Sequence, residues 1–155
     1  MRRAVFVSLI AGLGAAACAT PPAPGQIAGM GWSLAQVDGE GSKLAYGRPQ
    51  SDDVLVMLTC QPRSNGVRIA VLGQVASAHI DLGDGAQRRR VPAAASPAGI
   101  SNAVMIESTV APNDPVLARF SLSGELAIDV GDGTRLPLPA VDRGTVRRFI
   151  QTCRD

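Results

Sequence analysis

Short apolar segments divided by closely spaced turn residues constrain the fold of this chain more than any other feature. From residue 32 onward, runs rich in Val, Ile and Leu alternate with Gly, Asp, Pro and Asn. This pattern is typical of antiparallel β structure, in which short strands are joined by tight turns. We therefore predict an all-β or mainly β domain over residues 31–155, folded as an antiparallel sandwich or barrel.

The predicted strands differ in how they are covered. They are expected at residues 32–37, 43–46, 54–60, 67–71, 79–82, 87–91, 103–110, 116–120 and 126–130. Residues 54–60 are apolar nearly throughout, which indicates a central strand with both faces covered. Residues 67–71 alternate and are expected to pair with that strand. The hairpin of residues 79–91 is rich in polar side chains, which indicates an exposed sheet edge.

The last segment of the sequence has helical periodicity. Its apolar stripe, spaced i, i+3, i+4 and i+7, consists of Val146, Phe149, Ile150 and Cys153, and the positions off the stripe are Arg147, Arg148, Gln151 and Arg154. Asp142 is suited to cap the start, because its carboxylate can accept hydrogen bonds from the free N–H groups there. We predict one C-terminal α-helix with Cys153 on its buried face.

Residues 1–17 have the pattern of a secretory signal. Arg2 and Arg3 precede a charge-free apolar stretch that becomes rich in glycine and alanine toward its end. The stretch is shorter than the roughly 20 apolar residues that span a bilayer, so we expect it to be cleaved. Residues 18–30 mix proline, glycine and small residues without periodicity and are predicted to form a flexible tether.

The residues Ala15-Ala-Ala-Cys18 resemble the lipobox of bacterial lipoproteins. The resemblance implies that Cys18 is lipidated, becomes the first residue of the mature protein and anchors it to a membrane. Ala19 resembles the sorting rule of enteric outer-membrane lipoproteins, so we expect an outer-membrane protein that faces the periplasm. The lipobox prefers Leu where this chain has Ala15. Ordinary cleavage after Ala17 or Ala19, which would yield a soluble periplasmic protein, is the alternative.

The cysteine count supports export. The chain has 3 cysteines, and lipidation of Cys18 leaves Cys60 and Cys153 as a pair. A disulfide is the default state of such a pair in an oxidising compartment. Closing a loop of this length stabilises a fold by about 4 kcal/mol in the chain-entropy model. Two buried free thiols are the alternative.

The charge of the exported chain argues against one class of partner. The full chain has 15 basic and 13 acidic residues. Removal of the signal takes away Arg2 and Arg3, so the numbers of basic and acidic residues in the exported chain become equal. A nucleic-acid-binding protein needs a basic excess and usually aromatic platforms, and aromatic residues make up 3% of this chain. We therefore predict no nucleic-acid partner, and no motif indicates a cofactor.

His79 is the single histidine and the main candidate for catalysis. Asp81 lies two residues further, on the same strand face, as a general base and its orienting carboxylate would. No Gly-x-Ser-x-Gly motif accompanies them, and a zinc site needs three or four ligands. We predict that the protein is not an enzyme and binds no metal. A hydrolase that uses His79 is the alternative.

Two clusters of charge have structural and functional interpretations. Asp52 and Asp53 point to opposite faces of an extended chain and do not share a site, so we expect them to form a salt-bridge corner with Arg48. The run Arg88, Arg89 and Arg90 is the one local concentration of positive charge. It is either a contact for anionic lipid or lipopolysaccharide phosphate, or protection of a sheet edge against aggregation.

Two segments resemble small exported proteins of Gram-negative bacteria that have no assigned function. They are residues 43–60, Lys-Leu-Ala-Tyr-Gly-Arg-Pro-Gln-Ser-Asp-Asp-Val and onward to Cys60, and the segment Phe149-Ile-Gln-Thr-Cys153. The resemblance implies residence in the cell envelope and a β domain stapled by a disulfide. Residues 29–34, Gly-Met-Gly-Trp-Ser-Leu, resemble the opening of lipobox-bearing periplasmic inhibitors of secreted metalloproteases, which are small β-barrels.

These features predict a cell-envelope lipoprotein that acts as a non-enzymatic binding or assembly module. Its expected partners are the membrane, through the lipid on Cys18, and an envelope protein. A periplasmic protease inhibitor is the first alternative function, and the hydrolase that uses His79 is the second.

Overall fold

The computed structural model describes residues 26–61, 64–84, 87–99, 102–131 and 133–154. The predicted signal, Cys18 and most of the predicted tether lie outside the described residues. The elements in chain order are β1 (Gly31–Val37), β2 (Gly41–Gly47), β3 (Val54–Cys60), β4 (Val67–Gly73), β5 (His79–Gly83), β6 (Arg88–Pro92), β7 (Ala94–Pro97), β8 (Val104–Val110), α1 (Pro115–Ser123), β9 (Ala127–Val130) and α2 (Arg143–Thr152).

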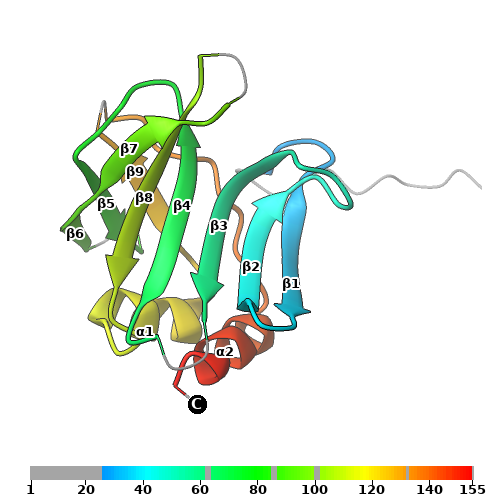
Figure 1. Cartoon of the computed structure of the whole chain (residues 1–155). Helices are drawn as coiled ribbons and strands as arrows, with labels where there is room; N and C mark the ends of the chain where they lie inside the picture. Colours follow the sequence, from blue (N-terminus) through cyan, green and yellow to red (C-terminus); the bar gives the residue numbers. More distant parts are fainter. Residues whose placement is uncertain (1–25, 62–63, 85–86, 100–101, 132, 155) are drawn as a thin grey trace, which may run out of the picture.

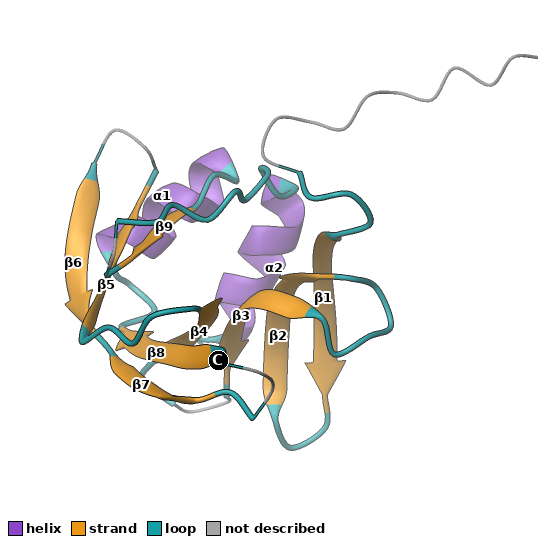
Figure 2. Cartoon of the chain, turned by 90° about the horizontal axis from the view of Figure 1, so that it is seen from above, coloured by secondary structure: helices purple, strands orange, loops and turns teal. Residues whose placement is uncertain are grey.

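Two antiparallel sheets form the frame of the described domain (Figure 1). The larger has six strands in the order β1-β2-β3-β4-β8-β7, and the smaller has three in the order β6-β5-β9. Seen from above, the larger sheet forms one layer, and the smaller sheet, α1 and α2 lie on one side of it (Figure 2). The prediction of a mainly β sandwich with a C-terminal helix is confirmed, and neither sheet closes into a barrel.

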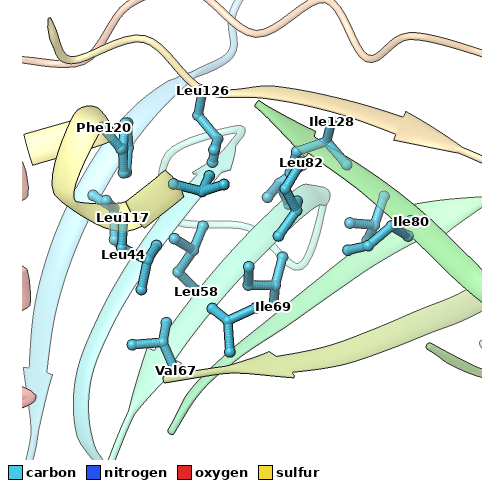
Figure 3. Close-up of a cluster of buried hydrophobic side chains, with 14 of the residues drawn as sticks. Leu44, Leu58, Val67, Ile69, Ile80, Leu82, Leu117, Phe120, Leu126 and Ile128 are labelled. Atoms are coloured by element: carbon cyan, nitrogen blue, oxygen red, sulfur yellow. The ribbon is translucent and has the colours of Figure 1, made fainter. Parts of the chain in front are cut away.

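The core lies between the larger sheet and the layer beside it. Leu44, Leu58 and Ile69 stand opposite one another on adjacent strands, and all three side chains are fully buried. The side chains that meet them from the other layer are labelled in Figure 3: Ile80, Leu82, Leu117, Phe120 and Ile128. Because β3 lies between β2 and β4, its predicted central position is confirmed.

The outer face of β3 differs from the prediction that both faces are covered. Met57 does not pack against the core and is only half-buried, whereas Val56 and Leu58 on either side of it are fully buried. Leu55 is also half-buried and packs against the core. A strand that is apolar on both faces is buried on both only if other elements pack against each side of the sheet. Both helices and the smaller sheet lie on the inner side here (Figure 2).

Residues 116–120, predicted to be a strand, belong to helix α1. The Asp114 carboxylate accepts a hydrogen bond from the Val116 N–H at 2.9 Å, and Pro115 occupies the first helical turn, where its missing N–H costs nothing. Gly124 ends the helix with φ 77°, a left-handed conformation that glycine adopts without strain. The prediction was wrong because it weighed the apolar residues and overlooked these start and stop signals.

Strand β7, which the sequence analysis did not predict, forms an edge of the larger sheet. It contains Pro97 and otherwise small residues, and all four of its residues are exposed. It pairs antiparallel with β8, the next strand along the chain, with Ala95 opposite Ile106. Proline within a strand is tolerated at such an edge, where one row of N–H groups faces away from the sheet.

Helix α2 confirms the predicted C-terminal helix and its cap. The Thr145 N–H donates to the Asp142 carboxylate at 2.8 Å, and the predicted apolar stripe is buried. Cys153 follows the helix and forms a disulfide with Cys60 at the end of β3, with the two Cα atoms 5.3 Å apart. The disulfide therefore joins α2 to the centre of the larger sheet, as predicted.

The end of the predicted tether is held against the domain. The Ile27 N–H donates to the hydroxyl of the fully buried Tyr46 at 3.0 Å, and Met30 packs against the core. Trp32, in the segment that resembles protease inhibitors, donates from Nε1 to the Pro139 carbonyl at 2.8 Å. These contacts give the first described residues a structural role.

Candidate functional site

An apolar groove on the outer face of the larger sheet is the main candidate site. Its volume is about 380 Å³, near the lower end of the range in which proteins hold small ligands. Its floor consists of Leu55, Met57, Ala70, Leu72 and Met105, contributed by β3, β4 and β8. Ala70 is buried, and the four larger side chains are half-buried.

Strand register brings these side chains together. Met57 lies opposite Ala70 across the β3–β4 pair, and Leu72 lies opposite Met105 across the β4–β8 pair. Since side chains alternate between the faces of a sheet, these residues point outward while their neighbours in sequence fill the core. The groove is therefore a consequence of strands that are apolar on both faces.

The rim of the groove is acidic at one end. Asp52 and Asp53, in the connection between β2 and β3, line it there, and Ala98 lines it from the connection between β7 and β8. Arg48 Nε lies 3.3 Å from Asp53 Oδ2, and the Arg48 N–H donates to the Asp53 carbonyl at 2.8 Å. Asp52 forms no ion pair with any described residue. The predicted salt-bridge corner thus joins Arg48 and Asp53 without Asp52.

The remainder of the same face is polar. Thr59, Arg68 and Thr109 form one row across β3, β4 and β8, and Arg68 Nη1 lies 3.7 Å from a Glu107 carboxylate oxygen. This row lies beyond the row that contains Met57 and Ala70. The outer face of the sheet is therefore divided into an apolar part, the groove, and a polar part.

The arrangement suits binding by shape and apolar contact. Methionine side chains are flexible and polarisable, so a floor with Met57 and Met105 can adapt to an apolar group of irregular shape. The carboxylate of Asp52 at the rim favours a ligand or partner that carries a positive charge next to its apolar part. Catalysis would need a positioned acid, base or nucleophile, and the described floor contains none of these groups.

His79 and Asp81 do not form the pair that the hydrolase alternative needs. Arg90 donates to both carboxylate oxygens of Asp81, at 2.9 Å and 3.0 Å, and these hydrogen bonds lower the pKa of Asp81 below its ordinary value. His79 bonds through its backbone to the Ser77 hydroxyl, which donates to the His79 carbonyl at 2.6 Å. No hydrogen bond joins the described His79 and Asp81 side chains.

The three arginines of β6 are each paired with an aspartate. The ion pairs are Arg88 with Asp129, Arg89 with Asp114 and Arg90 with Asp81. The aspartates belong to β9, the cap of α1 and β5, so the run holds several elements together. Contact of these arginines with an anionic surface stays a prediction, and their positive charge is already balanced within the domain.

A row of charged residues across the smaller sheet was missed by sequence reasoning. Asp81 and Asp129 lie opposite each other on β5 and β9, with Arg90 opposite Asp81 on the other side. Arg135 Nε lies 3.1 Å from the buried carboxylate of Asp129. The two aspartates are far apart in sequence, so only the strand pairing could reveal them as neighbours.

Within the described ranges, no three or more His, Cys, Asp or Glu residues lie close enough to hold a metal ion. Neither of the two described helices is long and apolar enough to cross a membrane. A comparison with known proteins finds no match among protein families, curated proteins or solved structures. The interpretation of the candidate site therefore depends on its own geometry.

Proposed function

We propose that the protein is a cell-envelope lipoprotein, anchored through Cys18, that acts as a non-enzymatic binding or assembly module. In this proposal the groove holds an apolar segment of an envelope protein partner. The observation that carries the proposal is the half-buried apolar floor of the groove, which includes Met57 and Leu72. A contiguous apolar surface beside polar residues is a common feature of interaction sites.

The outward apolar residues contribute less to the fold than their buried neighbours. Leu58 and Ile69 lose all contact with water on folding, whereas Met57 and Leu72 keep part of their surface exposed. Burial of that remaining surface by a partner would be favourable by roughly 25 cal/mol for each Å². Association with a partner would therefore bury apolar surface of the groove that stays in contact with water in the folded protein.

The negative charge at the rim indicates that the partner carries a positive charge. Asp52 has no cationic partner among the described residues, and Asp53 has only the exposed Arg48. An apolar segment that carries a lysine or arginine would therefore complement both the floor and the rim. The proposed partner is an envelope protein that presents such a segment.

Native mass spectrometry of the protein extracted from its own envelope tests this proposal. We expect a mature chain that begins at a triacylated Cys18, gains two hydrogen atoms on reduction of the Cys60–Cys153 disulfide and carries a protein partner. An unlipidated chain without a partner would contradict both the anchor and the binding role.

A pair of variants localises the partner to the groove. Met57→Glu places a charge on the apolar floor, and we expect the partner to be lost from the extracted protein. Thr109→Glu places the same charge on the polar part of the same face, and we expect the partner to be retained. Retention of the partner by the Met57→Glu chain would show that binding occurs elsewhere.

A further inference from the structure

The described cations fall into two groups. Every described lysine and arginine from residue 43 to residue 135 lies within 4.0 Å of a carboxylate oxygen. These paired residues are Lys43, Arg48, Arg68, Arg88, Arg89, Arg90, Arg119 and Arg135. Each of these cations therefore has a carboxylate beside it, and Asp129 serves both Arg88 and Arg135.

The arginines of α2 and the turn after it form the other group. Arg143, Arg147, Arg148 and Arg154 are all exposed, and none forms an ion pair with a described carboxylate. The spacing i, i+4 places Arg143 and Arg147 on one side of α2, and Arg154 lies in the turn just after the helix. We call these three residues the arginine stripe. Arg148 lies beside it and donates to the Thr145 hydroxyl at 3.0 Å.

The fold does not explain the arginine stripe. The side of α2 that packs against the domain contains Val146, Phe149 and Ile150, which are buried, whereas the three arginines of the stripe are exposed. Like charges four residues apart, as at Arg143 and Arg147, disfavour a helix slightly. A row of guanidinium groups that form no ion pair with a described carboxylate is instead suited to phosphate groups, which accept paired hydrogen bonds from arginine.

The start of the described chain lies near the same helix. Gln26 lines one surface pocket together with Asp142 and Thr145, at the first turn of α2. Eight residue steps separate Cys18 from Gln26, and such a segment spans at most about 28 Å when fully extended. A lipid on Cys18 would therefore keep Gln26, beside the first turn of α2, within about 28 Å of the membrane surface.

We propose that the arginine stripe of α2 binds the phosphate groups of an anionic bilayer. Basic side chains on a helix at a membrane surface are attracted by anionic headgroups, and each strengthens binding by about fivefold. The charge argument stands without the lipid, while the position of α2 near the membrane rests on the proposed anchor at Cys18. The paired arginines of β6 are not the membrane contact in this proposal.

Vesicle binding of the exported chain with Cys18→Ser tests the stripe in the absence of the lipid. Vesicles of phosphatidylcholine alone are compared with vesicles that also contain phosphatidylglycerol, at low and at raised salt. We expect binding only to the anionic vesicles and a marked decrease at raised salt. Arg143→Gln, Arg147→Gln and Arg154→Gln together are expected to lower the partition coefficient about a hundredfold.

A charge-matched variant provides the control. Lys43→Gln, Arg68→Gln and Arg90→Gln together remove the same charge from ion pairs at the surface of the sheets, and we expect binding within about threefold of the parent chain. Circular dichroism of both variants checks that the fold is retained. An equal loss of binding in both variants would overturn the proposal, because net charge would then explain it.

Two further outcomes would also overturn the proposal. One is equal binding of the parent chain to both kinds of vesicle. The other is binding to an acidic polymer such as heparin without binding to anionic vesicles. Because the chain used here has no lipid and the groove is unchanged, neither outcome depends on whether the anchor or the groove partner exists.

Discussion

Cys60, the last residue of β3, and Cys153, the residue after α2, form a disulfide with their Cα atoms 5.3 Å apart. The bond joins positions 93 residues apart in sequence and restricts a large loop in the unfolded chain. Both residues are buried. The C-terminal helix is thus held against the larger sheet by a covalent bond as well as by its apolar side.

Loss of this disulfide is expected to destabilise the domain strongly. Cys60→Ala with Cys153→Ala should lower the free energy of unfolding by about 4 kcal/mol, because the unfolded chain regains the entropy of the open loop. Urea unfolding of the oxidised parent and the double variant measures the difference. Cys18→Ser is the control and should leave stability unchanged. Equal stability of the double variant and the parent would show that the bond does not constrain the unfolded chain.

Asp114 is expected to be important for α1. Asp114→Ala removes the cap of the Val116 N–H and leaves Arg89 without its carboxylate, so we expect a loss of about 2 kcal/mol. Asp114→Asn keeps a capping oxygen but no charge and should cost less. Thermal or urea unfolding compares the two variants. An equal cost for both would mean that the ion pair with Arg89, rather than the cap, dominates.

The ion pair of Asp81 and Arg90 should make stability depend on pH. Hydrogen bonds from Arg90 lower the pKa of Asp81 in the folded protein below its ordinary value of about 3.9. The stabilisation is therefore fully present above about pH 4 and is lost as the pH falls through the lowered pKa. In an NMR titration, Arg90→Gln should raise the pKa of Asp81 toward the ordinary value. An unchanged pKa in this variant would show that another group is responsible.

Adjacent residues of β3 should respond differently to truncation. Leu58→Ala removes a fully buried side chain and should cost about 3 kcal/mol, whereas Met57→Ala on the half-buried outer face should cost about 1 kcal/mol. Urea unfolding of the two variants measures this contrast. A cost for Met57→Ala as large as that for Leu58→Ala would indicate that the outer face is covered in the free protein.

Local patterns in the sequence were sufficient for most of the strands, for α2 with its Asp142 cap and for the pairing of Cys60 with Cys153. These features depend on the period of apolar residues and on the chemistry of neighbouring residues, which are visible along the chain. The wrong prediction of a strand at α1 also concerned local sequence patterns. The Asp114-Pro115 start and the Gly124 stop are local signals, and five apolar-rich residues alone do not distinguish a strand from a helix.

The candidate sites depended on contacts between residues far apart in sequence. Apolar residues of β3 indicated burial on both faces, but only the placement of the layers showed that Met57 remains half-buried. The run at Arg88 is the largest local concentration of charge, yet strand pairing and helix packing bring an aspartate to each member. Strand pairing and packing bring no described carboxylate into an ion pair with the arginines of α2, although Asp142 at the helix cap lies near Arg148. The sequence by itself therefore determined most of the strands and the C-terminal helix, while the tertiary structure decided which apolar and charged groups remain available for binding.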